Sequence, residues 1–247
     1  MTMTRPVAGE IIAVTTTTFT AQSGALNEAP AFGSLLRVAN PRRKAGDRGD
    51  AGAPGGRIAA YYALCYGSQT GSIEPGRHAV AWGRFEDDEE DIYQRQPQLA
   101  QVLRTTFDAL LVGYETETPA LPVSSADLGD VAIAVLNGAV LAAVSETVAS
   151  APVQRVPAVP PRLHALVCQA TPAETARFNQ NLTYLRFVLR ANLPLADDFI
   201  AAAIRHAYEA SGDDETFLLD AARTVARLLG AEHERVMNIL ELLDDQG

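Results

Sequence analysis

The stretch Arg57–Ser68, RIAAYYALCYGS, constrains the fold of this chain more than any other. Its β-branched and aromatic residues, among them Ile58, Tyr61 and Tyr62, favour an extended backbone, and glycines or turn formers bound both ends. The apolar residues continue almost without alternation, which is typical of a strand covered on both faces. The sequence therefore predicts a central strand of a small closed β-barrel.

Segments before this strand predict its neighbours. Glu10–Val14 and the threonine-rich Thr15–Ala21 predict two strands separated by a bend or bulge near residues 15–17. Phe32–Ala39 predicts a third strand, with Gly33 where the backbone must bend sharply.

The segments after it are more ambiguous. Thr105–Tyr114 is compatible with a closing strand or a helix, and we predict a strand. Residues 131–148 are compatible with strands or a buried helix, and the Asn137-Gly138 pair between two apolar runs favours a hairpin. The proline-rich 151–161 segment marks a boundary, and Leu163–Cys168 predicts one more strand.

From residue 171 onwards, apolar residues recur at helical spacing. The motif TPAE at 171–174 predicts a capping box with proline at the first helical position. We expect this first helix to end at Asn192–Pro194, with one apolar face made of Phe178, Leu182, Leu185 and Leu189.

Three more helices are expected: one through residues 199–208, one capped by Asp213 and ended by Gly230, and one from Ala231 to about Leu243. The predicted fold class is α+β. It consists of a small closed β-barrel over residues 1–115, a proline-rich connector with additional strands over 116–170, and a four-helix bundle over 171–247.

Composition limits the class of function. With 20 Lys and Arg against 30 Asp and Glu, the net charge of −10 argues against a general nucleic-acid-binding surface. Cys65 and Cys168 each lie in an apolar run and are expected to be buried, reduced thiols, and the first residues contain no apolar signal region. We expect a cytoplasmic protein. Residues 131–144, the most apolar segment, are too short to span a bilayer of roughly 30 Å.

Two charged segments are candidate contacts. The glycine-rich loop at residues 40–56 is expected to be mobile, and its bases are either solvated or contact a nucleic acid or an acidic partner. The candidate basic residues are Arg42, Arg43, Lys44, Arg48 and Arg57. The acidic run is either solvated or docks on a basic partner. It comprises Glu86, Asp87, Asp88, Glu89, Glu90 and Asp91.

Motifs that would carry chemistry are not found. The four histidines are not spaced as zinc ligands, and the chain has neither a Gly-x-Ser-x-Gly elbow nor a dinucleotide-binding Gly-x-Gly-x-x-Gly loop. The polar loop at 67–72 lacks the lysine of a Walker motif. The sequence therefore predicts no catalytic residue, cofactor or metal.

The order of the N-terminal segments resembles a known domain. A short strand after Gly9, a threonine-rich strand, AFGSLLRV at 31–38, a loop and RIAAYYALCYGSQTGSIEPGRHAV at 57–80 are similar to the HAS-barrel. That domain is named for the HerA helicases and the ATP synthases, and the resemblance covers residues 7–115. It implies a barrel that packs beside its neighbours at one end of a hexameric ATPase ring.

The chain departs from this family after the barrel. HerA-like proteins continue into an ATPase core and work with a NurA-type nuclease in DNA end processing, whereas here a proline-rich link and helices follow. We therefore expect a non-enzymatic assembly or adaptor protein that self-associates or docks on a ring ATPase. The alternatives are a nucleic-acid-binding accessory protein that uses the basic loop, and an enzyme of a type that motifs do not reveal.

Overall fold

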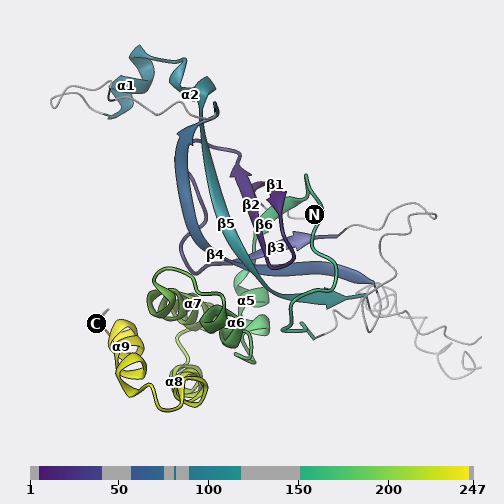
Figure 1. Cartoon of the computed structure of the whole chain (residues 1–247), viewed down its shortest axis with the longest axis vertical. Coiled ribbons are helices and arrows are strands. Elements are labelled where there is room, and N and C mark those ends of the chain that lie inside the picture. Colours follow the sequence, from purple (N-terminus) through teal and green to yellow (C-terminus); the bar gives the residue numbers. More distant parts are fainter. Residues whose placement is uncertain (1–5, 41–56, 75–80, 82–88, 118–150, 245–247) are drawn as a thin grey trace, which may run out of the picture.

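The computed structural model of the chain describes residues 6–40, 57–74, 81, 89–117 and 151–244 (Figure 1). Within these residues, six antiparallel strands close into a barrel in the order β1-β2-β5-β4-β3-β6. The strands are β1 (Val7–Val14), β2 (Thr18–Ser23), β3 (Leu35–Ala39), β4 (Ile58–Ser72), β5 (Leu103–Thr116) and β6 (Leu166–Gln169). The predicted α+β class with a closed barrel is confirmed. The expected hairpin at 131–148 lies outside the described residues.

The bend predicted near residues 15–17 is a tight turn between β1 and β2. The Thr15 hydroxyl oxygen accepts hydrogen bonds from the amides of Thr17 at 3.3 Å and Thr18 at 3.0 Å. Because these bonds hold the turn, Val14 pairs with Phe19 directly across the two strands.

The central strand is covered on both faces, as its unbroken apolar run predicted. Tyr61, Ala63 and Cys65 belong to the apolar cluster that fills the barrel, whereas Tyr62 and Leu64 belong to a second cluster shared with the helices. The side chains of β5 alternate between the same two clusters. The prediction of a strand at 105–114 is confirmed, because β5 includes these residues. The apolar run therefore results from a barrel interior on one side of the sheet and a helical layer on the other.

The barrel is closed by a strand from much later in the chain. β6 lies between β1 and β3, where Leu166 pairs with Glu10 and Val167 pairs with Val38. It falls within the connector with additional strands that the sequence analysis assigned to 116–170.

Helices gather at one end of the molecule, beside β3, β4 and β5, and two short helices lie at the other end (Figure 1). The latter are α1 (Glu89–Arg95) and α2 (Leu99–Val102). The larger group comprises α5 (Pro172–Phe178), α6 (Leu185–Arg190), α7 (Ala196–Ala210), α8 (Glu215–Leu229) and α9 (His233–Asp244). None of the helices in the described part of the chain combines the length and the apolar character that a membrane span needs.

The expectation of a single first helix in a four-helix bundle was wrong, because the chain leaves the helix after Phe178 and forms α6 only from Leu185. Buried Gln154 occupies the break. Its amide nitrogen donates to the carbonyl oxygens of Phe178 at 2.6 Å and of Asn181, and its side-chain oxygen accepts from the Tyr184 amide at 3.0 Å. A distant side chain thus satisfies backbone groups that a continuous helix would have paired internally.

Two helix caps test the local predictions. The capping box of α5 is confirmed: the Thr171 hydroxyl oxygen accepts from the Glu174 amide at 3.3 Å, and the Glu174 carboxylate accepts from the Thr171 amide at 3.0 Å. At α8 the cap is Asp214, whose carboxylate accepts from the Thr216 amide at 2.9 Å, and not Asp213. Asp213 instead has a left-handed backbone, with φ of 59°.

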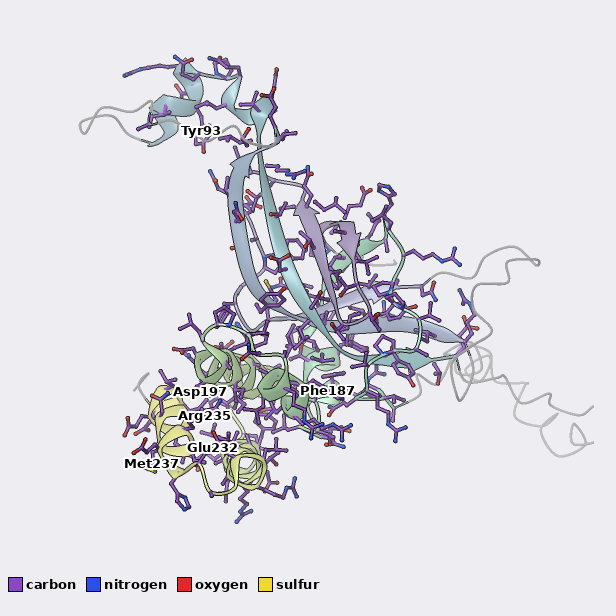
Figure 2. The ribbon with its side chains drawn as sticks, in the orientation of Figure 1. Tyr93, Phe187, Asp197, Glu232, Arg235 and Met237 are labelled. Atoms are coloured by element: carbon purple, nitrogen blue, oxygen red, sulfur yellow. The ribbon has the colours of Figure 1, made fainter. Side chains whose placement is uncertain are left out.

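The last helix, α9, is held to α7 by an ion pair between side chains as well as by apolar packing. Arg235 on α9 lies between Asp197 of α7 and Glu232 (Figure 2), with shortest nitrogen–oxygen distances of 2.5 Å and 2.9 Å. The hydrogen bonds from Arg235 to Asp197 and then to Glu232 raise the pKa of this guanidinium above its usual value. Ile239 is buried on the same helix, so α9 is part of the folded unit.

Gly33 explains how closely the helices approach the barrel. Its φ of +82° is the sharp bend predicted from the sequence, and a Cβ atom there would lie 2.7 Å from the Ala202 Cβ and 2.8 Å from the Ala203 nitrogen of α7. The backbone at Gly33 therefore touches the helix backbone, and only glycine fits.

We predict that Gly33→Ala lowers the free energy of unfolding by about 2–4 kcal/mol, because it combines a left-handed alanine with overpacking against α7. Urea denaturation followed by circular dichroism measures the change. Gly24→Ala is the matched control in the same loop, since a Cβ there meets nothing within 4 Å. Equal stability of the two variants would contradict the tight contact.

Candidate functional site

A cluster of charged side chains lies between the barrel and α5. Glu115 of β5 is only 5% exposed, and its carboxylate accepts a hydrogen bond from the Arg177 guanidinium of α5. Arg37 of β3 lies 3.9 Å from Glu115 and 3.3 Å from Glu174. The Arg177 guanidinium also donates to the Tyr62 hydroxyl at 3.3 Å. We refer to Arg37, Tyr62, Glu115, Glu174 and Arg177 as the polar seam.

The pKa values in the polar seam follow from burial and charge. Burial, followed by the negative charge of Glu115, raises the pKa of Tyr62 to about 12. Burial alone would lower the pKa of Arg177, but its hydrogen bond to Tyr62 and the neighbouring Glu115 raise it overall. Tyr62 therefore stays neutral and Arg177 stays charged over the physiological range. Groups held this firmly in one protonation state are suited to fixing α5 on the barrel.

The sequence analysis did not identify the polar seam. Its signal was present, since Arg37 interrupts the apolar run LLRVA and Glu115 follows LLVGY. A charged residue within a strand that is buried on both faces requires a partner of opposite charge. Which residue supplies that partner depends on the docking of α5, and no local pattern encodes this.

The second candidate site is an arm formed by the outer parts of two strands. Gly67–Ser72 of β4 pairs with Leu103–Asp108 of β5, and α1 and α2 lie beyond them, far from α5–α9 (Figure 1). We call these strand segments and the two helices the β4–β5 arm. β3 pairs with β4 only up to Leu64, so beyond Cys65 that edge of β4 has no strand neighbour within the described residues.

Hydrogen bonds fix the arm against the loop that precedes β3. The hydroxyl groups of Thr70 and Thr105 lie 2.8 Å apart, and the Asn27 amide donates to the Thr105 hydroxyl oxygen at 2.7 Å. The Asn27 side chain donates to the hydroxyl oxygen of Tyr93, which Figure 2 shows at the far end of the arm, at 2.9 Å. These bonds hold the arm in one orientation relative to the loop that precedes β3.

The predicted contact residues lie in different places. The structure describes Arg57 of the basic set, and its guanidinium donates to the Glu117 carboxylate and, at 3.0 Å, to the Asn40 carbonyl oxygen. Arg42, Arg43, Lys44 and Arg48 lie outside the described residues. A role for the basic set in binding nucleic acid stays a prediction.

The acidic run is divided between described and undescribed residues. Its second half, Glu89, Glu90 and Asp91, opens α1 at the end of the arm. Its first half, Glu86, Asp87 and Asp88, lies outside the described residues. A role for the run in docking a basic partner stays a prediction, and the backbone of α1 gives the position of its second half alone.

Residues that bear other chemistry are dispersed. Within the part of the chain that the structure describes, no three His, Cys, Asp or Glu residues are placed to share a metal ion. His164 lies before β6, not in a strand as expected, and its Nδ1 is 2.6 Å from Glu10. Both cysteines are free, but only Cys65 is fully buried, because Cys168 is half-buried on β6.

Comparison with known proteins adds no relative. No protein-family model matches this sequence, and a search of curated proteins finds no match either. The architecture of the barrel is that of a closed six-stranded antiparallel barrel within the described residues.

We predict that Glu115→Gln lowers the free energy of unfolding by about 2 kcal/mol, because it leaves Arg37 and Arg177 without their shared buried carboxylate. Urea denaturation at pH 7 measures the loss. Glu209→Gln on the exposed face of α7 is the control and should change stability by under about 0.5 kcal/mol. If both variants unfold at the same urea concentration, the polar seam does not stabilise the fold.

The raised pKa of Tyr62 predicts that the free energy of unfolding falls at high pH. Its pKa of about 12 in the folded chain exceeds the usual value of 10.0, so the folded state disfavours the phenolate. The contribution is complete below pH ~10 and is lost as the pH rises through about 12. Tyr62→Phe should therefore lose less stability between pH 10 and pH 12 than the wild type does, as measured by denaturation at stepped pH. Parallel curves for the two proteins would contradict this assignment.

Proposed function

We propose that this chain is a non-enzymatic assembly or adaptor protein, and that its β4–β5 arm contacts a protein partner. The observation that carries the proposal is that β4 continues to Ser72, past its last pair with β3 at Leu64, and that β5 begins at Leu103, before its first pair with β2 at Thr106. Leu103–Thr105 of β5 and the outer edge of β4 beyond Cys65 pair with no third strand within the described residues, so closure of the barrel gives no reason for their length.

The chemistry of the arm supports a protein contact. Ser68, Gln69 and Thr70 are exposed, and they carry neither charge nor proline along an edge of β4 without a strand neighbour in the described residues. Sheet edges that do not pair usually carry lysine, proline or another blocking feature. A polar, uncharged edge is suited to adding a strand from a partner.

The position of α1 supports a basic partner. α1 opens with three residues of the acidic run and lies at the end of the arm. Because acidic patches accelerate encounter with basic surfaces, this end of the arm is suited to first contact. We propose a second copy of the chain or a HerA-like ring ATPase as the partner, and HAS-barrel as the type of the barrel.

Replacement of the arm tip tests the proposal. Ser72 and Leu103 are paired, so a two-residue Asn-Gly turn can replace residues 73–102 without changing the strand register. We expect this variant to keep its melting temperature within a few degrees and to lose self-association or ATPase capture. Light scattering after size exclusion and pull-down from native cytoplasm measure these outcomes.

Variants that neutralise the acidic run distinguish the contribution of its charges to association from the contribution of the arm's backbone. Replacing Glu86, Asp87, Asp88, Glu89, Glu90 and Asp91 with the matching amides should slow association and remove its salt dependence. Glu209→Gln with Glu241→Gln removes exposed acids elsewhere and serves as the control. A strictly monomeric wild type that captures no ATPase would refute the proposal, and a tipless variant that associates normally would refute a contact at α1.

A further inference from the structure

Two arginines lie on α6 without an ion partner. Arg186 and Arg190 are four residues apart on this helix, so their side chains leave the same face. Arg190 is exposed and Arg186 is half-buried, and neither forms an ion pair within the described part of the chain. The Arg186 Nε is enclosed and has no hydrogen-bond partner there. This face of α6 therefore carries positive charge that no described carboxylate neutralises.

The surroundings of these arginines reinforce the positive charge. The Arg186 guanidinium lies 4.8 Å from the centre of the Phe187 ring, a cation–π contact that orders the side chain without using its N–H donors. No aspartate or glutamate occurs in the sequence between Glu174 and Asp197. Figure 2 shows Phe187 on the side of the helical group that is farther from α9. We call Arg186, Phe187 and Arg190 the α6 basic face. In a chain with a net charge of −10, such a face attracts acidic groups.

A matching acidic segment lies at the other end of the molecule. Glu89, Glu90 and Asp91 open α1 at the tip of the β4–β5 arm, and α1 is far from α6 (Figure 1). This separation keeps the two segments of one chain apart. The acidic segment of one copy can, however, meet the α6 basic face of another copy. Opposite charges at opposite ends of a molecule favour a head-to-tail contact between copies.

We propose that copies of this chain associate head to tail, with Glu89, Glu90 and Asp91 of one copy on the α6 basic face of the next. This contact rests on the proposed function of the arm, and adds to it the surface that receives the arm tip. Guanidinium groups suit these carboxylates because they present paired donors in one plane. A head-to-tail contact uses two different surfaces of each copy, so its repetition builds a ring or a filament instead of a closed dimer.

Removal of the two arginines tests the receiving surface. Arg186→Gln with Arg190→Gln should weaken self-association of the full chain at least about tenfold, as measured by sedimentation at several concentrations. Arg223→Gln with Arg227→Gln is the matched control, because these arginines are also four residues apart, lie exposed on α8 and change the net charge equally. This control should associate as the wild type does. Circular dichroism verifies that both variants fold, and Arg190→Gln alone, at an exposed position, should weaken association about threefold.

Mixing two defective variants tests which surfaces meet. The variant with amides throughout the acidic run keeps its α6 basic face, and the variant with Arg186→Gln and Arg190→Gln keeps its acidic run. At a concentration at which each alone is monomeric, an equimolar mixture should form a one-to-one dimer and nothing larger. Only one pair of intact surfaces remains in that mixture. Addition of NaCl to about 0.5 M should dissociate the dimer.

The outcomes distinguish this contact from the proposed function. The head-to-tail contact is supported if the α6 pair weakens association, the α8 pair does not, and the mixture restores a dimer. It is overturned if the two pairs behave alike or if the mixture stays monomeric, and the proposed function then stands on the association of the wild type. A monomeric wild type that captures a ring ATPase overturns the head-to-tail contact alone, whereas one that captures none refutes both.

Discussion

The burial of one three-stranded wall on both faces determines most of this structure. β3, β4 and β5 direct one set of side chains into the barrel and the other set under α5–α9. A barrel of six strands has a small interior, and a group of short helices has little core of its own. Because the barrel and the helices share this wall, their apolar layers are continuous. Aromatic pairs connect the wall to the helices, and the ring centroids of Tyr62 and Phe178 lie 4.9 Å apart.

Apolar packing does not by itself fix how the helices sit on the wall. Leucines and aromatic rings accept several arrangements of similar energy, whereas a buried carboxylate accepts few. Glu115 lies where Arg177 and Arg37 both reach it, and Gln154 holds the break between α5 and α6. These polar groups restrict α5 to one position, and the close approach at Gly33 does the same for α7. Stability thus comes mainly from apolar contacts, and orientation comes from polar ones.

Sequence reasoning succeeded where the controlling interactions are local. The strand at 57–68, the strand at 105–114, the bend at Gly33 and the Thr171 cap depend on residues close together in the chain. It failed at the helix break after Phe178, because Gln154 lies 24 residues away and no periodicity reports it. It also missed the polar seam, since the seam is assembled from two strands and a helix that lie far apart in the chain.

The late origin of β6 has a consequence for how the chain reaches its native state. Until residues 166–169 are available, β1 and β3 keep unpaired edges, because β6 is the strand that lies between them. Long-range pairings of this kind slow folding, since the entropy of closing the intervening loop is lost before the contacts form. A nascent or truncated chain that ends before residue 166 therefore presents two open edges that invite association with other chains. Sealing of the barrel thus removes two of the open strand edges through which this chain could aggregate.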